Sequence, residues 1–122
     1  MTRSFSPLSI KIGEIKIRIE VIDTSEKRTL GLSGRGSLDE NAGLLFIYPQ
    51  SDFHGIWMKS MKFPIDIIWF SSDKKVVGIA ENARPESFPE IFRPAEPARY
   101  VLEVNAGYVK KSNIKIGDQT EF

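Results

Sequence analysis

The chain has 122 residues, with 17 Lys or Arg, 16 Asp or Glu and no Cys. This length suits one domain over 1–122, and the balanced charge argues against a nucleic-acid partner, because proteins that neutralise phosphates usually carry a basic excess. Without cysteine the chain has no disulfide, no thiolate-bound metal and no thiol nucleophile.

Strict alternation of apolar and polar residues begins after a tail over 1–7 that we expect to be loose. From Leu8 to Val21 every second residue is apolar, and the rhythm is interrupted only at Gly13–Glu14. A period of two with one apolar face is typical of half-buried strands, and a two-residue connection that begins with glycine suits a β-hairpin. The sequence therefore predicts a hairpin over this segment.

A short helix is expected next. Asp23 followed by Glu26 resembles a capping box, in which Asp23 caps the helix. Gly31 suits the position just after a helix end. These signals predict a helix over 25–30.

Four strands are predicted in the middle of the chain. LLFIY at 44–48 is an apolar run that we expect Pro49 to end, since proline cannot donate to a sheet ladder. A strand is expected near 53–58. The apolar runs at 65–70 and 76–80 then predict a central strand and its hairpin partner.

The last third begins with an irregular segment. Residues 82–99 include four prolines and are expected to form a long loop of the kind that often serves as a lid or binding loop. A strand over 100–104 follows. Asn105 is expected to cap a helix over 106–111, and 114–122 is expected to form the final strand. Seven or eight short strands indicate a sandwich or barrel rather than a parallel α/β sheet.

Six motifs occur in order along most of the chain. They are EKRTLGLSGR at 26–35, GLLFI at 43–47, WMK at 57–59, PIDII at 64–68, VLEVNAG at 101–107 and IKIGD at 114–118. On these motifs the chain, from about Ile15 to Phe122, resembles the domain-of-unknown-function family numbered 192, a set of small microbial proteins, many with an export signal. Ser33, Leu44 and Ser60–Met61 depart from the family's usual residues.

The resemblance implies a compact β fold of jelly-roll-like character and no established reaction, substrate or cofactor. Combined with the strand pattern, it predicts a mostly β, single-domain sandwich or barrel with two short helices.

Two acids stand among apolar neighbours on predicted strands, Asp66 and Glu103. Because an unpaired buried charge is costly, one interpretation is that each acid is hydrogen-bonded or paired with Lys59, Arg28 or Arg35. The other interpretation is a polar pocket at one end of the barrel, where these acids meet a ligand.

Trp57 and Lys59 lie where a predicted strand leaves the sheet. Trp57 is either a core residue or a platform beside a cation, an arrangement that suits sugar rings and other flat polar ligands. Further walls are available from aromatic residues elsewhere in the chain, namely Tyr48, Phe53, Phe92 and Tyr100. The candidate ligand-binding residues are therefore Arg35, Trp57, Lys59, Asp66 and Glu103.

Metal and covalent chemistry have little support. His54 is the one histidine, and a zinc site made by protein ligands usually needs two or three His or Cys residues. The chain has no G-x-S-x-G elbow. We therefore expect no metal and no cofactor, and we assign no catalytic residue.

These observations favour a non-enzymatic binding module for a small polar ligand, such as a carbohydrate or an envelope-associated compound. Two alternatives stay open: a hydrolase-like enzyme that uses Asp66 and Glu103, and a protein-interaction adaptor that uses the loop over 82–99. No apolar run approaches the roughly 20 residues of a membrane span, and the start has no apolar signal segment. We expect a soluble protein without a signal peptide in this chain, and the resemblance also admits an exported one.

Overall fold

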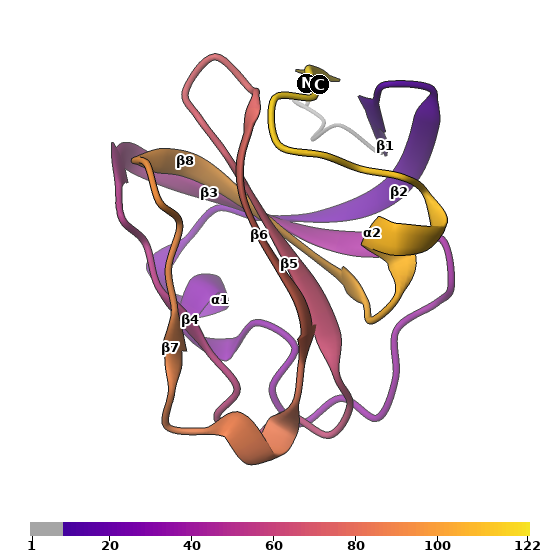
Figure 1. The fold of residues 1–122 in the computed structure, drawn as a ribbon. Coiled ribbons are helices and arrows are strands. Elements are labelled where there is room, and N and C mark those ends of the chain that lie inside the picture. Colours follow the sequence, from indigo (N-terminus) through magenta and orange to yellow (C-terminus); the bar gives the residue numbers. More distant parts are fainter. Residues whose placement is uncertain (1–8) are drawn as a thin grey trace, which may run out of the picture.

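The computed structural model describes residues 9–122, and the expected tail over 1–7 lies outside this range. Seven strands form one curled sheet in the order β6-β5-β8-β3-β2-β1-β9, while β4 and β7 pair as a separate ribbon (Figure 1). The elements are β1 (Ser9–Ile12), β2 (Ile15–Ile22), α1 (Ser25–Leu30), β3 (Ala42–Asp52), β4 (Ile56–Trp57), β5 (Ile65–Phe70), β6 (Val76–Ala83), a 3₁₀ turn (Pro85–Ser87), β7 (Ile91–Phe92), β8 (Ala98–Asn105), α2 (Tyr108–Lys111) and β9 (Thr120–Glu121). The prediction of a mostly β fold with two short helices is confirmed.

The predicted N-terminal hairpin is present as β1 and β2. Ile12 pairs with Ile15, which leaves Gly13 and Glu14 as the two-residue turn. Gly13 has a φ of 58°, a left-handed conformation that glycine adopts without a steric penalty.

Helix α1 has the predicted bounds but a different cap. The side chain of Thr24, not that of Asp23, accepts a hydrogen bond from the backbone N–H of Lys27 at 3.2 Å. The helix lies in the connection between β2 and β3, which are parallel neighbours. Parallel strands need a crossover of a dozen or more residues, and the segment that contains α1 supplies it.

Several predicted boundaries in the middle of the chain are wrong. Strand β3 continues through Pro49, because its pairing with β8 shifts register between Ile47 and Asp52 and Pro49 falls in that irregular stretch. The strand expected near 53–58 is reduced to the two residues of β4. The expected loop over 82–99 contains β7, which pairs with β4.

The C-terminal region also differs from expectation. Helix α2 is shorter than predicted and is preceded by Gly107, whose φ is 92°, with no side-chain cap from Asn105. The segment over 114–122 contributes only β9, which pairs with β1 at the sheet edge.

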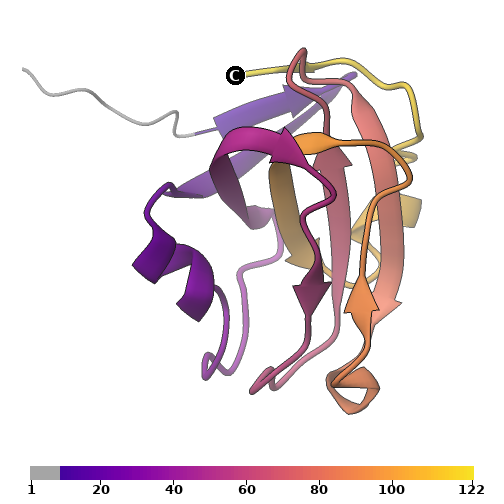
Figure 2. The ribbon, with the colours of Figure 1, turned by 90° about the vertical axis from the view of Figure 1, so that its left-hand side faces the viewer.

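The curled sheet has an apolar core on each face. Leu102 and Val104 of β8 belong to the core that includes Val109 of α2. Val101 of β8 belongs to the other core, which includes Leu32 after α1 and Ile56 of β4. Figure 2 shows α1, β4 and β7 toward the viewer and α2 behind the sheet. Side chains that alternate along one strand therefore enter different environments.

Candidate functional site

Asp66, on β5, is fully buried and is held by backbone groups. Its Oδ1 accepts a hydrogen bond from the N–H of Asn82 at 2.8 Å, and its Oδ2 accepts from the N–H groups of Gly107 at 3.1 Å and Val109 at 2.9 Å. One carboxyl group therefore ties β6 and the start of α2 to the central strand. This agrees with the structural interpretation, with amide groups in place of the expected cations.

Glu103, on β8, faces the opposite side of the sheet. Asp66 pairs with Val104, the residue next to Glu103, and successive side chains of a strand point to opposite faces. The cross-strand neighbours of Glu103 are the apolar Leu44 and Ile67. Glu103 is only 5% exposed.

The carboxyl group of Glu103 has no hydrogen-bond or ion-pair partner within residues 9–122. Burial raises its pKa from 4.5 to about 8, because the charged form loses its hydration without gaining a compensating contact. At neutral pH this side chain is therefore mostly protonated, and it both donates and accepts hydrogen bonds.

Glu103 lines a pocket of about 250 Å³, here named the Glu103 pocket, together with residues of α1, β3 and β4. Arg28 lines it from α1, and its Nη1 donates to the carbonyl of Ile47 at 2.9 Å. The guanidinium carbon lies 5.2 Å from the centre of the Tyr48 ring, and His54 stacks on that ring with centroids 3.7 Å apart. Burial and then the nearby Glu103 raise the pKa of Tyr48 to about 12, so its hydroxyl group stays protonated.

The remaining walls of the Glu103 pocket combine apolar side chains with polar groups, and the polar groups make up the larger part of the exposed lining. The apolar side chains include Leu32, Phe46, Met61 and Ile65, and Trp57 stands at the edge with 46% of its surface exposed. Phe88 packs on Trp57 with ring centroids 5.0 Å apart, and the Lys59 ammonium lies 5.6 Å from the centre of the Trp57 ring.

Gly31 ends α1 beside the Glu103 pocket and brings the helix close to the sheet. Its φ is 49°, and a Cβ atom at this position would lie 3.3 Å from the tip of the Phe46 ring. A larger residue would be strained there and would push α1 away from β3.

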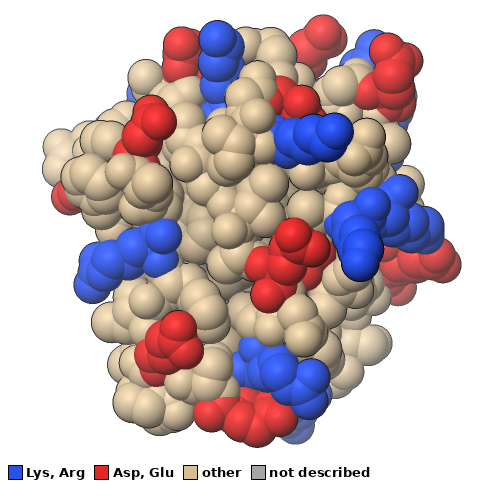
Figure 3. Space-filling view, viewed as in Figure 1, with Lys and Arg blue, Asp and Glu red and all other residues tan. Residues whose placement is uncertain are grey.

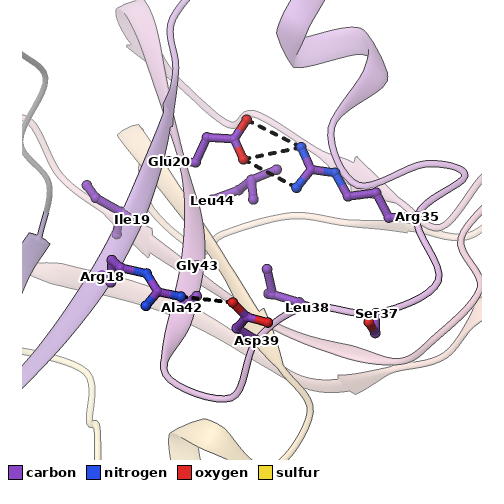
Figure 4. Close-up of a pocket in the computed structure, with 10 residues that line it drawn as sticks. All are labelled: Arg18, Ile19, Glu20, Arg35, Ser37, Leu38, Asp39, Ala42, Gly43 and Leu44. Atoms are coloured by element: carbon purple, nitrogen blue, oxygen red, sulfur yellow. Dashed lines mark hydrogen bonds and ion pairs between the residues drawn. The ribbon is translucent and has the colours of Figure 1, made fainter.

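A second cavity, of about 400 Å³, lies between β2, β3 and the loop that follows α1 (Figure 4). Arg35 there pairs with Glu20 at 3.2 Å, and Arg18 pairs with Asp39 at 3.0 Å. These charges are exposed and satisfy one another. Exposed pairs contribute at most about 1 kcal/mol and leave no group that requires a ligand.

The structure therefore brings together two of the five candidate residues, Trp57 and Glu103. Arg35 lines the second cavity, Lys59 lies against the outer part of Trp57, and Asp66 is on the other face of the sheet.

Sequence reasoning named Arg28 only as a possible ion-pair partner of the buried acids, a pairing that residues 9–122 do not show, and did not place it in the pocket. The alternation over 44–48 does place Phe46 and Tyr48 on one face, as observed, but no local pattern shows which strands α1 covers.

Within residues 9–122, no group of three His, Asp or Glu side chains is arranged to hold a metal ion. No helix in the same range has the length and apolar character needed to cross a membrane.

Comparison with known proteins gives consistent matches. The model of the family DUF192, described as "Uncharacterized ACR", matches residues 8–122. A UPF0127 protein of Pyrococcus furiosus is 30% identical over 114 residues, which cover 89% of this chain and 90% of that protein.

Two crystal structures are similar in fold. A protein of unknown function from Novosphingobium aromaticivorans has a TM-score of 0.88 at 31% identity, with 93% of this chain and 84% of that chain covered. A Sinorhizobium meliloti protein, described as a proposed transcription regulator, has a TM-score of 0.87 at 30% identity. The match covers 99% of this chain and 97% of that chain.

Proposed function

Because this chain belongs to the uncharacterized family DUF192, whose matched relatives name no reaction, we propose a function from the pocket itself: the protein binds a small polar ligand through the Glu103 pocket. The observation that carries this proposal is the carboxyl group of Glu103, which is buried at a pocket and has no partner among the described residues 9–122. A buried polar group without a partner costs about 1–3 kcal/mol, and an apolar residue would suit the neighbouring Leu44 and Ile67 better. A ligand that hydrogen-bonds to the carboxyl group accounts for its presence.

The pocket's dimensions limit the ligand. Its volume of about 250 Å³ lies below the roughly 300–1,000 Å³ of pockets for drug-sized molecules, so the ligand is a fragment-sized compound. The half-exposed ring of Trp57 at the edge suits contact with a flat polar molecule, whereas the Tyr48 ring is already stacked by His54. The proposed ligands include carbohydrates and envelope-derived fragments of this size.

The alternative of a hydrolase that uses Asp66 and Glu103 together has less support. Their side chains leave the sheet on opposite faces, and Asp66 is occupied by three backbone N–H groups. One substrate cannot contact both carboxyl groups, so the proposal assigns no catalytic pair.

The adaptor alternative rests on exposed apolar side chains near β7. Phe88 and Ile91 are exposed, as is Trp57. Phe88 packs on Trp57, and Trp57 lines the Glu103 pocket. Phe88 therefore borders the edge of the Glu103 pocket through Trp57, whereas Ile91 lines a separate hollow with Trp57 and Arg93, and the adaptor function stays the second candidate.

We propose no nucleic-acid partner for this protein. The formal net charge is +1, and basic and acidic side chains are interleaved on the face in Figure 3. Non-specific nucleic-acid binding depends on a concentrated positive surface, which this face does not present.

Fragment binding followed by NMR tests the proposal. Wild type, Glu103→Gln and the control Glu20→Gln are titrated with a library of sugars, amines, amino acids and carboxylates while backbone amide signals are recorded. Glu20 lies on the same face of the sheet but outside the Glu103 pocket, so its substitution should leave binding unchanged. At least one class of fragment should shift the signals of the pocket residues, with affinity at least tenfold weaker in Glu103→Gln. Equal affinity in wild type and Glu103→Gln, or no fragment at the pocket, would overturn the proposal.

A further inference from the structure

We infer that the ligand of the Glu103 pocket is a small zwitterion of the α-amino acid type, whose ammonium group meets Glu103 and whose carboxylate meets Arg28. This inference rests on the proposed function and adds the chemical class of the ligand.

A basic and an acidic side chain line the pocket and do not pair with each other. Neither Arg28 nor Glu103 takes part in an ion pair within residues 9–122. By contrast, the basic and acidic residues of the second cavity are paired across it. A ligand with both charges would satisfy Arg28 and Glu103 together.

Arg28 keeps most of its hydrogen-bonding capacity. A guanidinium group has five N–H donors, and the described structure uses one of them, toward the carbonyl of Ile47. The hydrogen bond to Ile47 and the Tyr48 ring, whose centre is 5.2 Å from the guanidinium carbon, restrict the position of the guanidinium group. A fixed guanidinium group with free donors suits the two oxygens of a carboxylate.

The ring of Tyr48 shows that both charges act on the same small region. The guanidinium carbon of Arg28 is 5.2 Å from the ring centre. Arg28 lowers the pKa of Tyr48 whereas Glu103 raises it, so both groups lie within electrostatic reach of one hydroxyl group. A ligand whose two charges are attached to a single carbon atom suits this compact arrangement.

The apolar walls leave room for a side chain. Leu32, Phe46 and Met61 line the same pocket as the two charged groups. Leu32 and Phe46 are almost fully buried, so the apolar side chain of an amino acid would lie toward Met61, Leu30 and Trp57, which keep exposed surface, with its charges at Arg28 and Glu103.

Binding of an ammonium group should be linked to pH. The carboxyl group of Glu103 must ionise to hold an ammonium ion, so binding releases a proton and tightens as the pH rises toward 8. The groups that face it are Arg28 from α1 and Tyr48 from β3, and the raised pKa of Tyr48 keeps its hydroxyl group neutral between pH 6 and 8.

Other titratable groups near the pocket need a control. Strands β4 and β5 present the apolar Ile56, Trp57 and Ile65 to the pocket, and Glu20, two strands from Glu103, is paired with Arg35. His54 stacks on Tyr48 and is the remaining titratable neighbour. A His54→Phe variant should therefore keep the pH dependence.

The test uses matched probes in isothermal titration calorimetry from pH 6 to pH 8. The zwitterions are L-leucine, L-methionine and L-phenylalanine. 3-Methylbutylamine lacks the carboxylate of leucine, 4-methylpentanoate lacks its ammonium group, and methyl α-D-glucopyranoside represents the sugars. At least one zwitterion should bind, at least tenfold more tightly than its two truncated analogues, with affinity rising by up to about tenfold per pH unit below pH 8.

The variants assign each contact. Glu103→Gln should abolish the preference for leucine over 4-methylpentanoate and the proton release, and Arg28→Gln should abolish the preference over 3-methylbutylamine. Zwitterion binding that is unchanged by Glu103→Gln would overturn the inference. If the glucoside binds in a Glu103-dependent manner and no zwitterion binds, the inference of an amino-acid ligand is overturned but the proposed function stands. Failure of every probe in this set and in the fragment library would overturn both.

Discussion

Replacing Glu103 with glutamine should make the protein more stable, by an amount that grows with pH. Glutamine has the shape of the protonated acid and cannot ionise. In wild type the pKa of Glu103 is about 8, above its ordinary value of 4.5, so the folded state retains a proton that the unfolded state loses. Between these two values the stability that this group contributes falls by about 1.4 kcal/mol per pH unit, because the unfolded state binds fewer protons.

The expected difference follows directly. Below pH 4.5 both proteins carry a neutral side chain at this position and should have similar free energies of unfolding. At pH 7 Glu103→Gln should be more stable by about 3 kcal/mol, and above pH 8 the difference should level off near about 5 kcal/mol. Contributions from other ionisable groups cancel in the comparison, since both proteins share them.

Urea unfolding followed by tryptophan fluorescence at pH 4, 6, 7 and 8.5 measures this difference. Glu20→Gln, which removes an exposed acid from the same sheet face, should change stability by less than about 1 kcal/mol at every pH. A difference between wild type and Glu103→Gln that stays constant from pH 4 to 8.5, or a less stable variant at pH 7, would refute the reasoning.

Three further substitutions test the framework around the pocket. Asp66→Asn replaces an oxygen that accepts buried N–H groups with an N–H₂ group, so it should lower the free energy of unfolding by about 2–4 kcal/mol in the same urea titration. The control Asp39→Asn, at an exposed ion pair, should lower it by less than about 1 kcal/mol. Gly43→Ala would place a Cβ 2.9 Å from a side chain of β8 and 3.0 Å from its backbone, so we expect the free energy of unfolding to fall by about 1–3 kcal/mol. Gly36→Ala, where a Cβ meets open space, should change it little. Equal thermal midpoints for the two variants would contradict the close packing at Gly43. Thr24→Ala should cost about 1 kcal/mol through loss of the α1 cap, and an unchanged melting temperature would show that the cap lies elsewhere.

The strand pattern of the sequence predicted most of the sheet because its signals are local. The hairpin of β1 and β2 and the buried strand β5 depend on alternation or on an apolar run within a few residues. The predicted strand boundaries were wrong where pairing with a strand distant in sequence decides where the element ends. Pro49 stays within β3 because the register shift there removes the need for its N–H, and no local signal shows that shift.

The candidate site was predictable only in part for the same reason. Apolar surroundings identified Asp66 and Glu103 as unusual, but adjacent positions on β8 decide that they face opposite sides of the sheet. Asp66 is satisfied by backbone groups that lie 16 to 43 residues away. The place of Arg28 in the pocket depends on how the crossover lays α1 over β3, which the residues of α1 do not encode alone.

The most direct test of a buried, partnerless acid at the pocket is its own titration. The side-chain carboxyl signal of Glu103 in ¹³C-labelled protein, assigned by comparison with Glu103→Gln, should titrate with a pKa of about 8. A midpoint near the ordinary value of 4.5 would mean that Glu103 is hydrated or paired, and the argument for a ligand at this pocket would fail.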